Sequence, residues 1–327
     1  MPATPSPTAT SAAADHPPRL VEDLGPIGGQ ALIDGVMMRR AGAWGAAVRR
    51  SDGTIATTVT ALPGDGDGVR RIPLLRGSVA LWESVRLGTR AMLWGAQERG
   101  TEDGKGYSKG GLALTTAIAG ALAVTFLVLL PAAVPKLLGL DGRWAFNLVE
   151  TGVRLAVLVG YMALLSLSPE VRRTFAYHGA EHMTIHAYEH GVALEPAAIR
   201  RFDRRHPRCG TAFLLLVVLV ALLAHVIVGS PSWPVLVASR LVGLPLVAGV
   251  AYEAIRLAGT RRHQLVGRIL MAPGSWLQGL TTAEPDDDQI EVAIAALRAT
   301  TSLEDGAASP AGTAPGPAAA VPVGVGA

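Results

Sequence analysis

Apolar runs long enough to cross a lipid bilayer constrain the fold of this 327-residue chain more than any other feature. A helix needs about 20 residues to span the hydrocarbon core. The runs at 112–131 and 211–229 contain no Asp, Glu, Lys or Arg, so each predicts a membrane-spanning helix. Charged residues make up only 17% of the chain, whereas soluble proteins usually carry about a quarter. The composition therefore indicates a membrane protein.

Two weaker apolar runs, at 153–169 and 235–254, predict a second and a fourth span. Arg154 and Arg240 interrupt them, and we expect these long side chains to extend toward the membrane interface. Pro245 predicts a kink in the fourth run. Helices buried in a soluble core are the alternative for these two runs.

The distribution of Lys and Arg predicts the orientation of the four spans. Residues 1–110 carry 13 of these residues, and the segment between the second and third runs carries seven arginines. The first connection holds only Lys136 and Arg143, and the third connection holds none. We therefore expect a multipass cell-membrane protein with both termini and the segment 169–210 in the cytoplasm. The arginines lie beside apolar runs without interleaved aromatic residues, so a nucleic-acid partner is not expected.

The remaining boundaries follow from composition. The ends at 1–18 and 306–327, rich in small residues and proline, predict disordered tails. Residues 19–110 predict a cytoplasmic module, 111–258 the four-span region, and 259–305 a cytoplasmic C-terminal segment. The predicted fold class is thus a mainly α membrane protein with a small N-terminal α+β module, a histidine-rich helical loop and a C-terminal amphipathic helix.

The N-terminal module contains two stretches with strand character, QALIDGVMM and GAAVRRSDGTIATTVT. Asp52-Gly53 suits a hairpin turn within the second stretch. A helix is expected at 73–99, with one apolar arc and one charged arc. This helix could lie in the membrane interface or pack on the core of the protein. The members of the apolar arc are Leu74, Leu81, Trp82, Val85 and Met92.

The C-terminal segment contains EPDDDQIEVAIAALRA, which has the acidic opening of a helix. Asp288 and Glu291 stand at the spacing of a capping box. Ile290, Ile294 and Leu297 form an apolar stripe. The pattern predicts an amphipathic helix whose acidic start explains the run of aspartates.

Four of the 8 histidines, His178, His182, His186 and His190, follow one another at a four-residue step in YHGAEHMTIHAYEHG. In a helix, neighbours at this step lie about 6 Å apart along the axis and can bind one ion. His178 and His186 are two turns apart and cannot easily share an ion. A straight helix therefore requires two sites or a further ligand from elsewhere. A solvated face of ordinary polar histidines is the alternative.

The first pair of histidines lies in HGAEH, which has the H-x-x-E-H arrangement of inverted zinc peptidases. In that chemistry two histidines hold zinc and the glutamate accepts a proton from water. We therefore predict a divalent metal, with zinc the first choice. His178 and His182 are its predicted ligands, and Glu181 is the predicted general base.

Further candidate ligands lie in the same segment. His206 and Cys209 occur in HPRCG, on the same predicted side of the membrane as the histidine stretch. Both are good zinc ligands, and His206 is the favoured third ligand. Cys209 could instead be a small buried residue. His186 and Glu189 complete the candidate set.

Long motifs in the chain resemble the signatures of the bacterial YqhQ-like family. They are GGQALIDGVMMR, PLLRGSVALWES, YHGAEHMTIHAYE, FDRRHPRCGTAFLLLV and TTAEPDDDQIEVAIAAL. The resemblance extends from residue 28 to residue 297. It implies a multipass membrane protein of a family without known function, sometimes labelled a predicted metal-dependent enzyme.

The resemblance supports the same residues as motif positions. These are His178, Glu181, His182, His186, Glu189, His206, Arg208 and Cys209. His190 lies beyond the recognised motif, Met183 replaces an expected lysine, and Asp34 replaces an expected glutamate.

The sequence thus predicts a metal-binding membrane protein and favours a metal-dependent hydrolase acting at the cytoplasmic face. A non-enzymatic scaffold or assembly factor with a structural metal is the alternative. A membrane di-iron oxygenase is disfavoured. A resemblance to the membrane desaturases and hydroxylases would imply about eight histidines in several boxes, and only five histidines and His263 are within plausible reach here. A transporter is disfavoured because the spans show no paired charges near the middle of the bilayer. The expected partners are the lipid bilayer and an unknown substrate or protein at the cytoplasmic face.

Overall fold

The computed structural model describes residues 27–62, 72–100, 109–207, 209–229, 232–260 and 265–302. The predicted tails at 1–18 and 306–327 lie outside these residues, as do Arg208 and His263.

The N-terminal module contains a four-stranded antiparallel sheet in the order β1-β2-β3-β4. Its strands are β1 (Gly28–Leu32), β2 (Gly35–Arg40), β3 (Ala43–Arg49) and β4 (Ile55–Ala61). QALIDGVMM, predicted as a strand, instead turns back at Asp34, whose φ of 53° lies in the left-handed region. The predicted turn at Asp52-Gly53 is confirmed, because Gly53 has a φ of 84° and Asp52 accepts a hydrogen bond from the Thr54 amide.

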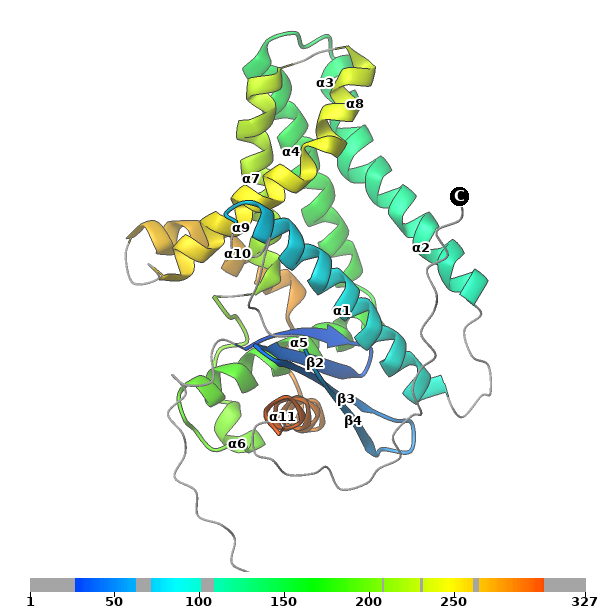
Figure 1. Cartoon of the computed structure of the whole chain (residues 1–327), viewed down its shortest axis with the longest axis vertical. Helices are drawn as coiled ribbons and strands as arrows, with labels where there is room; N and C mark the ends of the chain where they lie inside the picture. The colour runs from blue at the N-terminus through cyan, green and yellow to red at the C-terminus, as the bar shows by residue number, and fades with distance from the viewer. Residues whose placement is uncertain are drawn as a thin grey trace, which may run out of the picture.

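Helices cover both faces of the sheet (Figure 1). Alternate residues of a strand point to opposite faces, so Met37 and Leu32 pack against α1 (Leu75–Gly100), with Leu87 and Ala91. Val36 and Met38 face the other side, toward the two helices that cover it. Those helices are α5 (Pro169–Glu189) and α11 (Asp287–Thr301). The result is a three-layered module built from both ends of the chain.

The apolar arc predicted for α1 does not pack on the core of the protein. Leu81, Trp82, Val85 and Met92 are all exposed. Figure 1 shows α1 crossing between the sheet module and the bundle of apolar helices. The placement of this arc in the membrane interface stays a prediction, and the exposed side chains agree with it.

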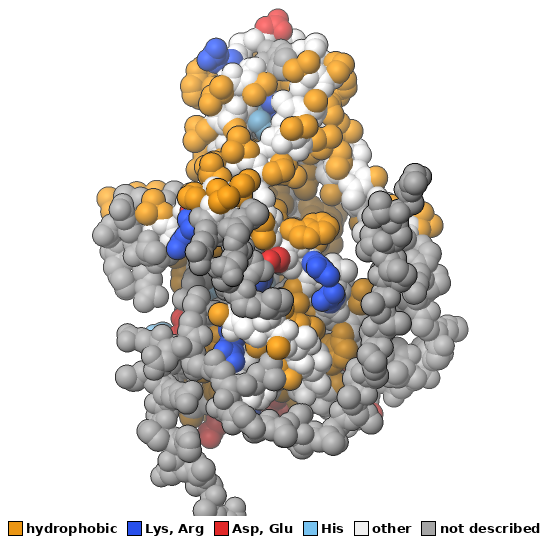
Figure 2. Space-filling view, in the orientation of Figure 1, with side chains coloured by type: hydrophobic (Ala, Val, Ile, Leu, Met, Phe, Trp, Pro, Cys, Tyr) orange, Lys and Arg blue, Asp and Glu red, His pale blue; other side chains and the backbone are white. Residues whose placement is uncertain are grey.

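The apolar helices form an elongated bundle above the module (Figure 1). Helix α2 (Lys109–Val124), the π-helix η3 (Thr125–Leu129) and α3 (Leu130–Leu137) follow one another, and the stretch Leu114–Leu137 is long and apolar enough to cross a membrane. Helix α4 (Arg143–Leu165) is the second such stretch. On the face in Figure 2, hydrophobic side chains cover much of this bundle.

Two further apolar elements complete the bundle. Helices α8 (Trp233–Val242) and α9 (Leu244–Thr260) meet at a bend of 43° and together count as one further candidate span. The break lies at Gly243, two residues before Pro245, so the helix bends close to the kink that Pro245 predicts. Helix α7 (Gly210–Val228) has a shorter apolar part, Phe213–Val228. The described residues thus hold two helices long enough to cross a membrane, or three with the bent pair, and the four-span topology stays a prediction.

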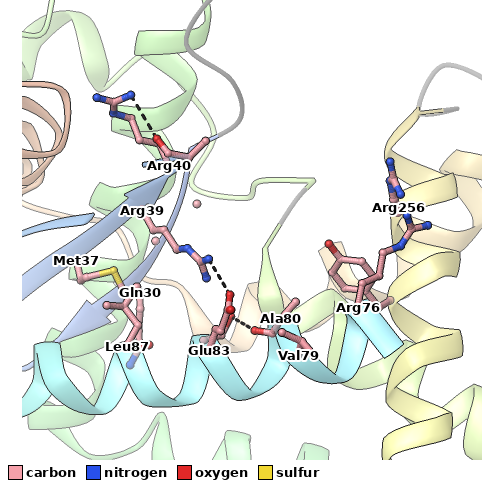
Figure 3. Close-up of a pocket in the computed structure, with 15 residues that line it drawn as sticks. Gln30, Met37, Arg39, Arg40, Arg76, Val79, Ala80, Glu83, Leu87 and Arg256 are labelled. Carbon is pink, nitrogen blue, oxygen red and sulfur yellow. Dashed lines mark hydrogen bonds and ion pairs between the residues drawn. The ribbon is translucent and has the colours of Figure 1, made fainter. Parts of the chain in front are cut away.

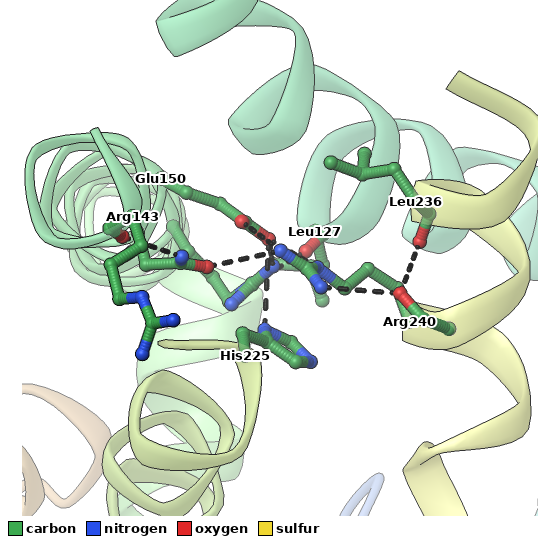
Figure 4. A network of polar contacts seen from close by, with 9 residues as sticks. Leu127, Arg143, Glu150, His225, Leu236 and Arg240 are labelled. Atoms are coloured by element: carbon green, nitrogen blue, oxygen red, sulfur yellow. Dashed lines mark hydrogen bonds and ion pairs between the residues drawn. The ribbon is translucent and has the colours of Figure 1, made fainter. Parts of the chain in front are cut away.

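Arg154 and Arg240 do not extend toward an interface as predicted. Both are buried, and both bind the buried carboxylate of Glu150 on α4, at 2.6 and 2.7 Å (Figure 4). Arg154 also donates to the Leu127 carbonyl in the π-helix, at 2.8 Å. His225 Nδ1 lies 3.8 Å from Glu150 Oε1. The prediction that the spans lack paired charges is therefore wrong, because Glu150 pairs with Arg154 on its own helix and with Arg240 on α8 inside the bundle.

The C-terminal segment contains a helix that the sequence did not suggest, α10 (Leu265–Thr281), which packs against α7 and α9. The predicted helix α11 is present, and its apolar stripe is buried. Its capping box is formed by Asp286 and Gln289 rather than by Asp288 and Glu291, so the helix begins two residues earlier than predicted. A short helix, α6 (Pro196–Ile199), lies between α5 and the HPRCG segment.

Candidate metal centre

A single unbroken helix, α5, carries the regularly spaced histidines, and His190 is its C-terminal capping residue. Because the helix is straight over two turns, His178 and His186 belong to different groups of side chains. The structure brings each group together with partners from the segment that follows α6. All six predicted ligands lie in one of two adjoining groups.

The first group consists of His178, His182 and Cys209, whose ligand atoms all lie within 4.8 Å of one another. The Cys209 Sγ atom is 3.3 Å from His178 Nε2. The sequence favoured His206 as the partner of His178 and His182, whereas Cys209 takes that place in the structure. Cys209 is the residue before the first turn of α7, and its side chain is buried.

Backbone carbonyls orient the two histidines of the first group. His178 Nδ1 lies 2.8 Å from the Thr281 carbonyl, and His182 Nδ1 lies 2.6 Å from the Arg204 carbonyl. A carbonyl can only accept a hydrogen bond, so each Nδ1 carries the proton and each Nε2 keeps a lone pair. This arrangement is usual for histidines that bind a metal through Nε2.

The second group consists of His186, Glu189 and His206, again with ligand atoms within 4.8 Å of one another. His186 Nε2 lies 3.0 Å from the Arg205 carbonyl, so Nε2 carries the proton and Nδ1 keeps a lone pair. The rings of His186 and His206 are 4.6 Å apart between centroids, and those of His182 and His206 are 5.7 Å apart. The two groups therefore adjoin through His206.

Gln278 on α10 fixes the backbone of His206. Its side-chain carbonyl accepts from the His206 amide at 2.7 Å, and its amide group donates to the His206 carbonyl at 3.0 Å. Gln278 is fully buried, so both bonds are shielded from water. Nothing in the sequence marked Gln278 as part of a site, because its role depends on the packing of α10. Thr281 opens the TTAEPDDD motif, and its carbonyl role also depends on this packing.

Burial lowers the pKa of His182 and of His186 below the usual value for histidine. Both side chains are therefore neutral at physiological pH, which is the form of histidine that binds a metal ion.

Glu181, the predicted base, is 3% exposed and lines a cavity of about 700 Å³ together with His178, His182, His206 and Cys209. Among the residues described, its buried Oε2 atom has no hydrogen-bond partner. Burial raises the pKa of this carboxyl to about 7, and His178 and His206 act in the opposite direction. A buried carboxyl with a vacant acceptor atom beside candidate ligands can exchange a proton with a molecule in the cavity.

Gly29 on β1 permits this position of Glu181. A Cβ atom at Gly29 would lie 2.7 Å from Glu181 Oε1 and 2.6 Å from the Met37 carbonyl oxygen. Both distances are shorter than real contacts allow, so the strand can approach Glu181 only with glycine at this point.

Other residues singled out in the sequence belong to neither group. His190 is exposed, and its Nδ1 contacts the His186 carbonyl at 2.7 Å. Asp34 joins two helices, because its carboxylate binds Arg99 of α1 at 2.9 Å and Arg173 of α5. Met183 is buried in the core of the module.

The fold and the site define a mainly helical protein with a small antiparallel sheet, helices long and apolar enough to cross a membrane, and histidine groups that could hold a metal. The chain belongs to the DUF1385 family, whose description is "Protein of unknown function (DUF1385)" and whose model matches residues 72–303. It is 32% identical over 297 residues to "Uncharacterized protein YqhQ" of Bacillus subtilis (strain 168), over 85% of this chain and 92% of that protein. No solved structure matches the chain. The YqhQ-like resemblance is thereby confirmed.

Proposed function

We propose that this protein is a multipass membrane hydrolase that depends on a divalent metal at the cytoplasmic face. One observation carries the proposal: a group of two histidines and a cysteine borders a cavity beside the buried carboxyl of Glu181. The distribution of Lys and Arg supports the cytoplasmic location of this cavity.

The donor set of the first group suits zinc. Imidazole nitrogen and thiolate sulfur are the ligands that zinc prefers, and catalytic zinc sites commonly use three protein ligands and leave one position open. His178, His182 and Cys209 would hold the ion, and His186, Glu189 and His206 would hold a second. When bound, such an ion supplies Lewis acidity to the substrate and to water.

Glu181 would accept the proton of the attacking water. Glu181 lines a cavity large enough for a substrate, and glycine at position 29 lets the strand lie close to the carboxyl group. The Thr281 and Arg204 carbonyls would hold the imidazoles of His178 and His182 in the orientation for metal binding.

A structural metal in a non-enzymatic scaffold is the other reading. Structural zinc sites are closed by four protein ligands, whereas each group here offers three and the first one borders a cavity. This difference favours the hydrolase.

Metal analysis tests the site. We expect full-length protein purified in detergent to contain at least about one equivalent of zinc per chain by inductively coupled plasma mass spectrometry. The double variant His178→Ala with His182→Ala removes two of the three ligands of the first group and should lose that metal. His190→Ala is the matched control, because it removes an exposed histidine of the same helix that belongs to neither group.

Glu181→Gln separates catalysis from metal binding. The variant should keep its metal and lose hydrolysis of a panel of chromogenic esters and phosphodiesters by at least about a hundredfold. Metal well below one equivalent in the wild type, or unchanged in the double variant, would exclude the proposed site. A Glu181→Gln protein that keeps its activity, or that still complements a strain lacking the protein, would favour the scaffold.

A further inference from the structure

A second cavity, of about 660 Å³, adjoins the one beside Glu181. Six residues line both cavities, so the two spaces share a wall. They are Gly28, Gly29, Gln30, Ala80, Ser84 and Tyr252. A ligand that occupied both cavities would pass these six residues on its way to the candidate metal centre.

The second cavity is basic. Arg39, Arg40, Arg76 and Arg256 line it, and Glu83 is the single acidic residue among the described residues of its wall. Figure 3 shows Arg76 and Arg256 at one end, where α1 meets α9, and Arg39 and Glu83 nearer the sheet.

The arginines outnumber the carboxylates that neutralise them. Arg39 binds Glu83 at 3.2 Å, and Arg76 binds Glu253 on α9. Arg40 is buried and donates to the Thr300 carbonyl, so it is left out of this count. The other three arginines against two carboxylates leave a surplus of one positive charge. Arg256 is exposed and makes no hydrogen bond or ion pair with the part of the chain that the structure describes. A cavity of this charge selects an anionic group, and guanidinium groups match the oxygen atoms of phosphate.

The cavity beside Glu181 is apolar on the side that faces the helix bundle, in contrast to the basic second cavity. Phe213 at the start of α7, Ile255 on α9 and Leu81 on α1 line it there. Phe213 begins the apolar part of α7, and Leu81 belongs to the exposed apolar arc of α1. The wall of this cavity is thus continuous with surfaces that suit a lipid tail.

We propose that the two cavities bind one phospholipid with an anionic phosphate headgroup. The phosphate lies among Arg39, Arg76 and Arg256, and the apolar tail leaves past Leu81 and Phe213. An acyl ester of the lipid would then lie beside Glu181. Water would add to its carbonyl carbon as Glu181 accepts the proton of that water, and the glycerol oxygen would leave as an alcohol with that proton, which gives a fatty acid and a lysophospholipid. The cleavage of the bound lipid rests on the proposed hydrolase function. The binding of the lipid does not require the metal.

Lipid binding to full-length protein in detergent micelles tests the proposal. Fluorescent phosphatidylglycerol should bind at least about tenfold more tightly than phosphatidylcholine of the same chain length, because only the first lipid has a net negative headgroup. Arg256→Gln should weaken the binding of phosphatidylglycerol by about tenfold, and Arg39→Gln should act in the same direction. Arg172→Gln, which removes an exposed arginine of α5 outside both cavities, is the matched control and should change affinity by less than about twofold.

Each contrary result has a distinct meaning. Equal affinity for the two lipids, or an equal loss in Arg172→Gln and Arg256→Gln, would overturn the headgroup site. Inorganic phosphate could instead displace the fluorescent lipid at the same concentration as unlabelled phosphatidylglycerol does. That result would overturn the lipid and favour a soluble phosphate compound as the ligand. Lipid selectivity retained in a chain that holds no metal would support the lipid site while removing the proposed hydrolysis.

Discussion

At the scale of single residues, two glycines control how closely backbone segments approach the candidate centre. Gly29 admits Glu181 beside β1, and Gly179 on α5 faces the segment after α10. A Cβ atom at Gly179 would lie 2.3 Å from the Ala283 carbonyl oxygen. The Ala283 amide also donates to the Phe175 carbonyl at 2.9 Å, which holds the two segments together. The glycine within HGAEH therefore serves packing rather than chemistry.

Gly179→Ala should destabilise the protein by about 1–3 kcal/mol, because the added methyl group overlaps the carbonyl oxygen of Ala283, a residue that is held in place by the hydrogen bond from its amide to Phe175. Thermal unfolding in detergent, followed by intrinsic tryptophan fluorescence, measures the change. Gly160→Ala on α4 is the matched control, because no atom lies within 4 Å of its added Cβ. Helix propensity predicts that this control is neutral or stabilising by up to about 1 kcal/mol. An unfolding temperature of Gly179→Ala equal to that of the control would contradict the close contact.

The sequence predicted the candidate ligands one by one but could not assign them to groups. Helix periodicity alone indicates that His178 and His186 need different partners. The pairing of Cys209 with His178, and of His206 with His186, depends on how the chain returns after α6. That return is fixed by Gln278 on α10, which lies more than seventy residues away in the sequence and carries no recognisable signal.

At the scale of secondary-structure elements, the cluster around Glu150 joins α4, α7, α8 and the π-helix. The π-helix places the Leu127 carbonyl where Arg154 can donate to it, and the Arg240 side chain reaches from α8 to Asn147 as well as to Glu150. A π-helix in an apolar segment often marks such a site. Sequence reading treated each arginine separately, because partners on different helices are invisible to periodicity.

Glu150→Gln should destabilise the bundle by about 3–5 kcal/mol, because it leaves two buried arginines without their shared carboxylate. Unfolding in detergent by heat or by denaturant checks the loss. Glu170→Gln removes an exposed glutamate at the start of α5 and should cost less than about 1 kcal/mol. Similar stability of the two variants would mean that the cluster contributes little to holding the helices together.

The elements themselves were predictable where one pattern dominates. The hairpin of β3 and β4 follows from its Asp52-Gly53 turn, α1 and α11 follow from amphipathic spacing, and the apolar runs follow from composition. Helix α10 was missed because Pro273 lies inside it and argues against a helix. The start of α11 was placed two residues late because Asp286, Asp287 and Asp288 all suit a cap, and only the contact of Gln289 with Asp286 distinguishes them.

At the scale of the whole molecule, the orientation in the membrane decides which compartment the candidate centre faces. The connection between α3 and α4 lies at the end of the bundle away from the sheet, whereas the segment after α5 belongs to the module (Figure 1). The predicted topology places the first outside the cell and the second in the cytoplasm.

Cysteine labelling tests this topology, since Cys209 is buried and contributes little background. A membrane-impermeant maleimide applied to intact cells should label Asp141→Cys, in the connection after α3, and should not label Glu195→Cys, in the segment after α5. Both positions are exposed. Permeabilised cells should show labelling of both variants. Labelling of Glu195→Cys in intact cells would reverse the orientation.

The module that carries the site has a consequence for biosynthesis. Its sheet is complete at Ala61, yet Ile290 and Leu297 of α11 belong to the core that covers Val36 and Met38. A ribosome adding about 5–20 residues per second reaches α11 tens of seconds after it has finished the sheet. During that interval only α5 is available to cover this apolar face of the sheet, and the part that α11 covers is exposed while the membrane helices are being inserted. A chaperone bound near the N-terminus of the growing chain would shield that face until the last helix arrives.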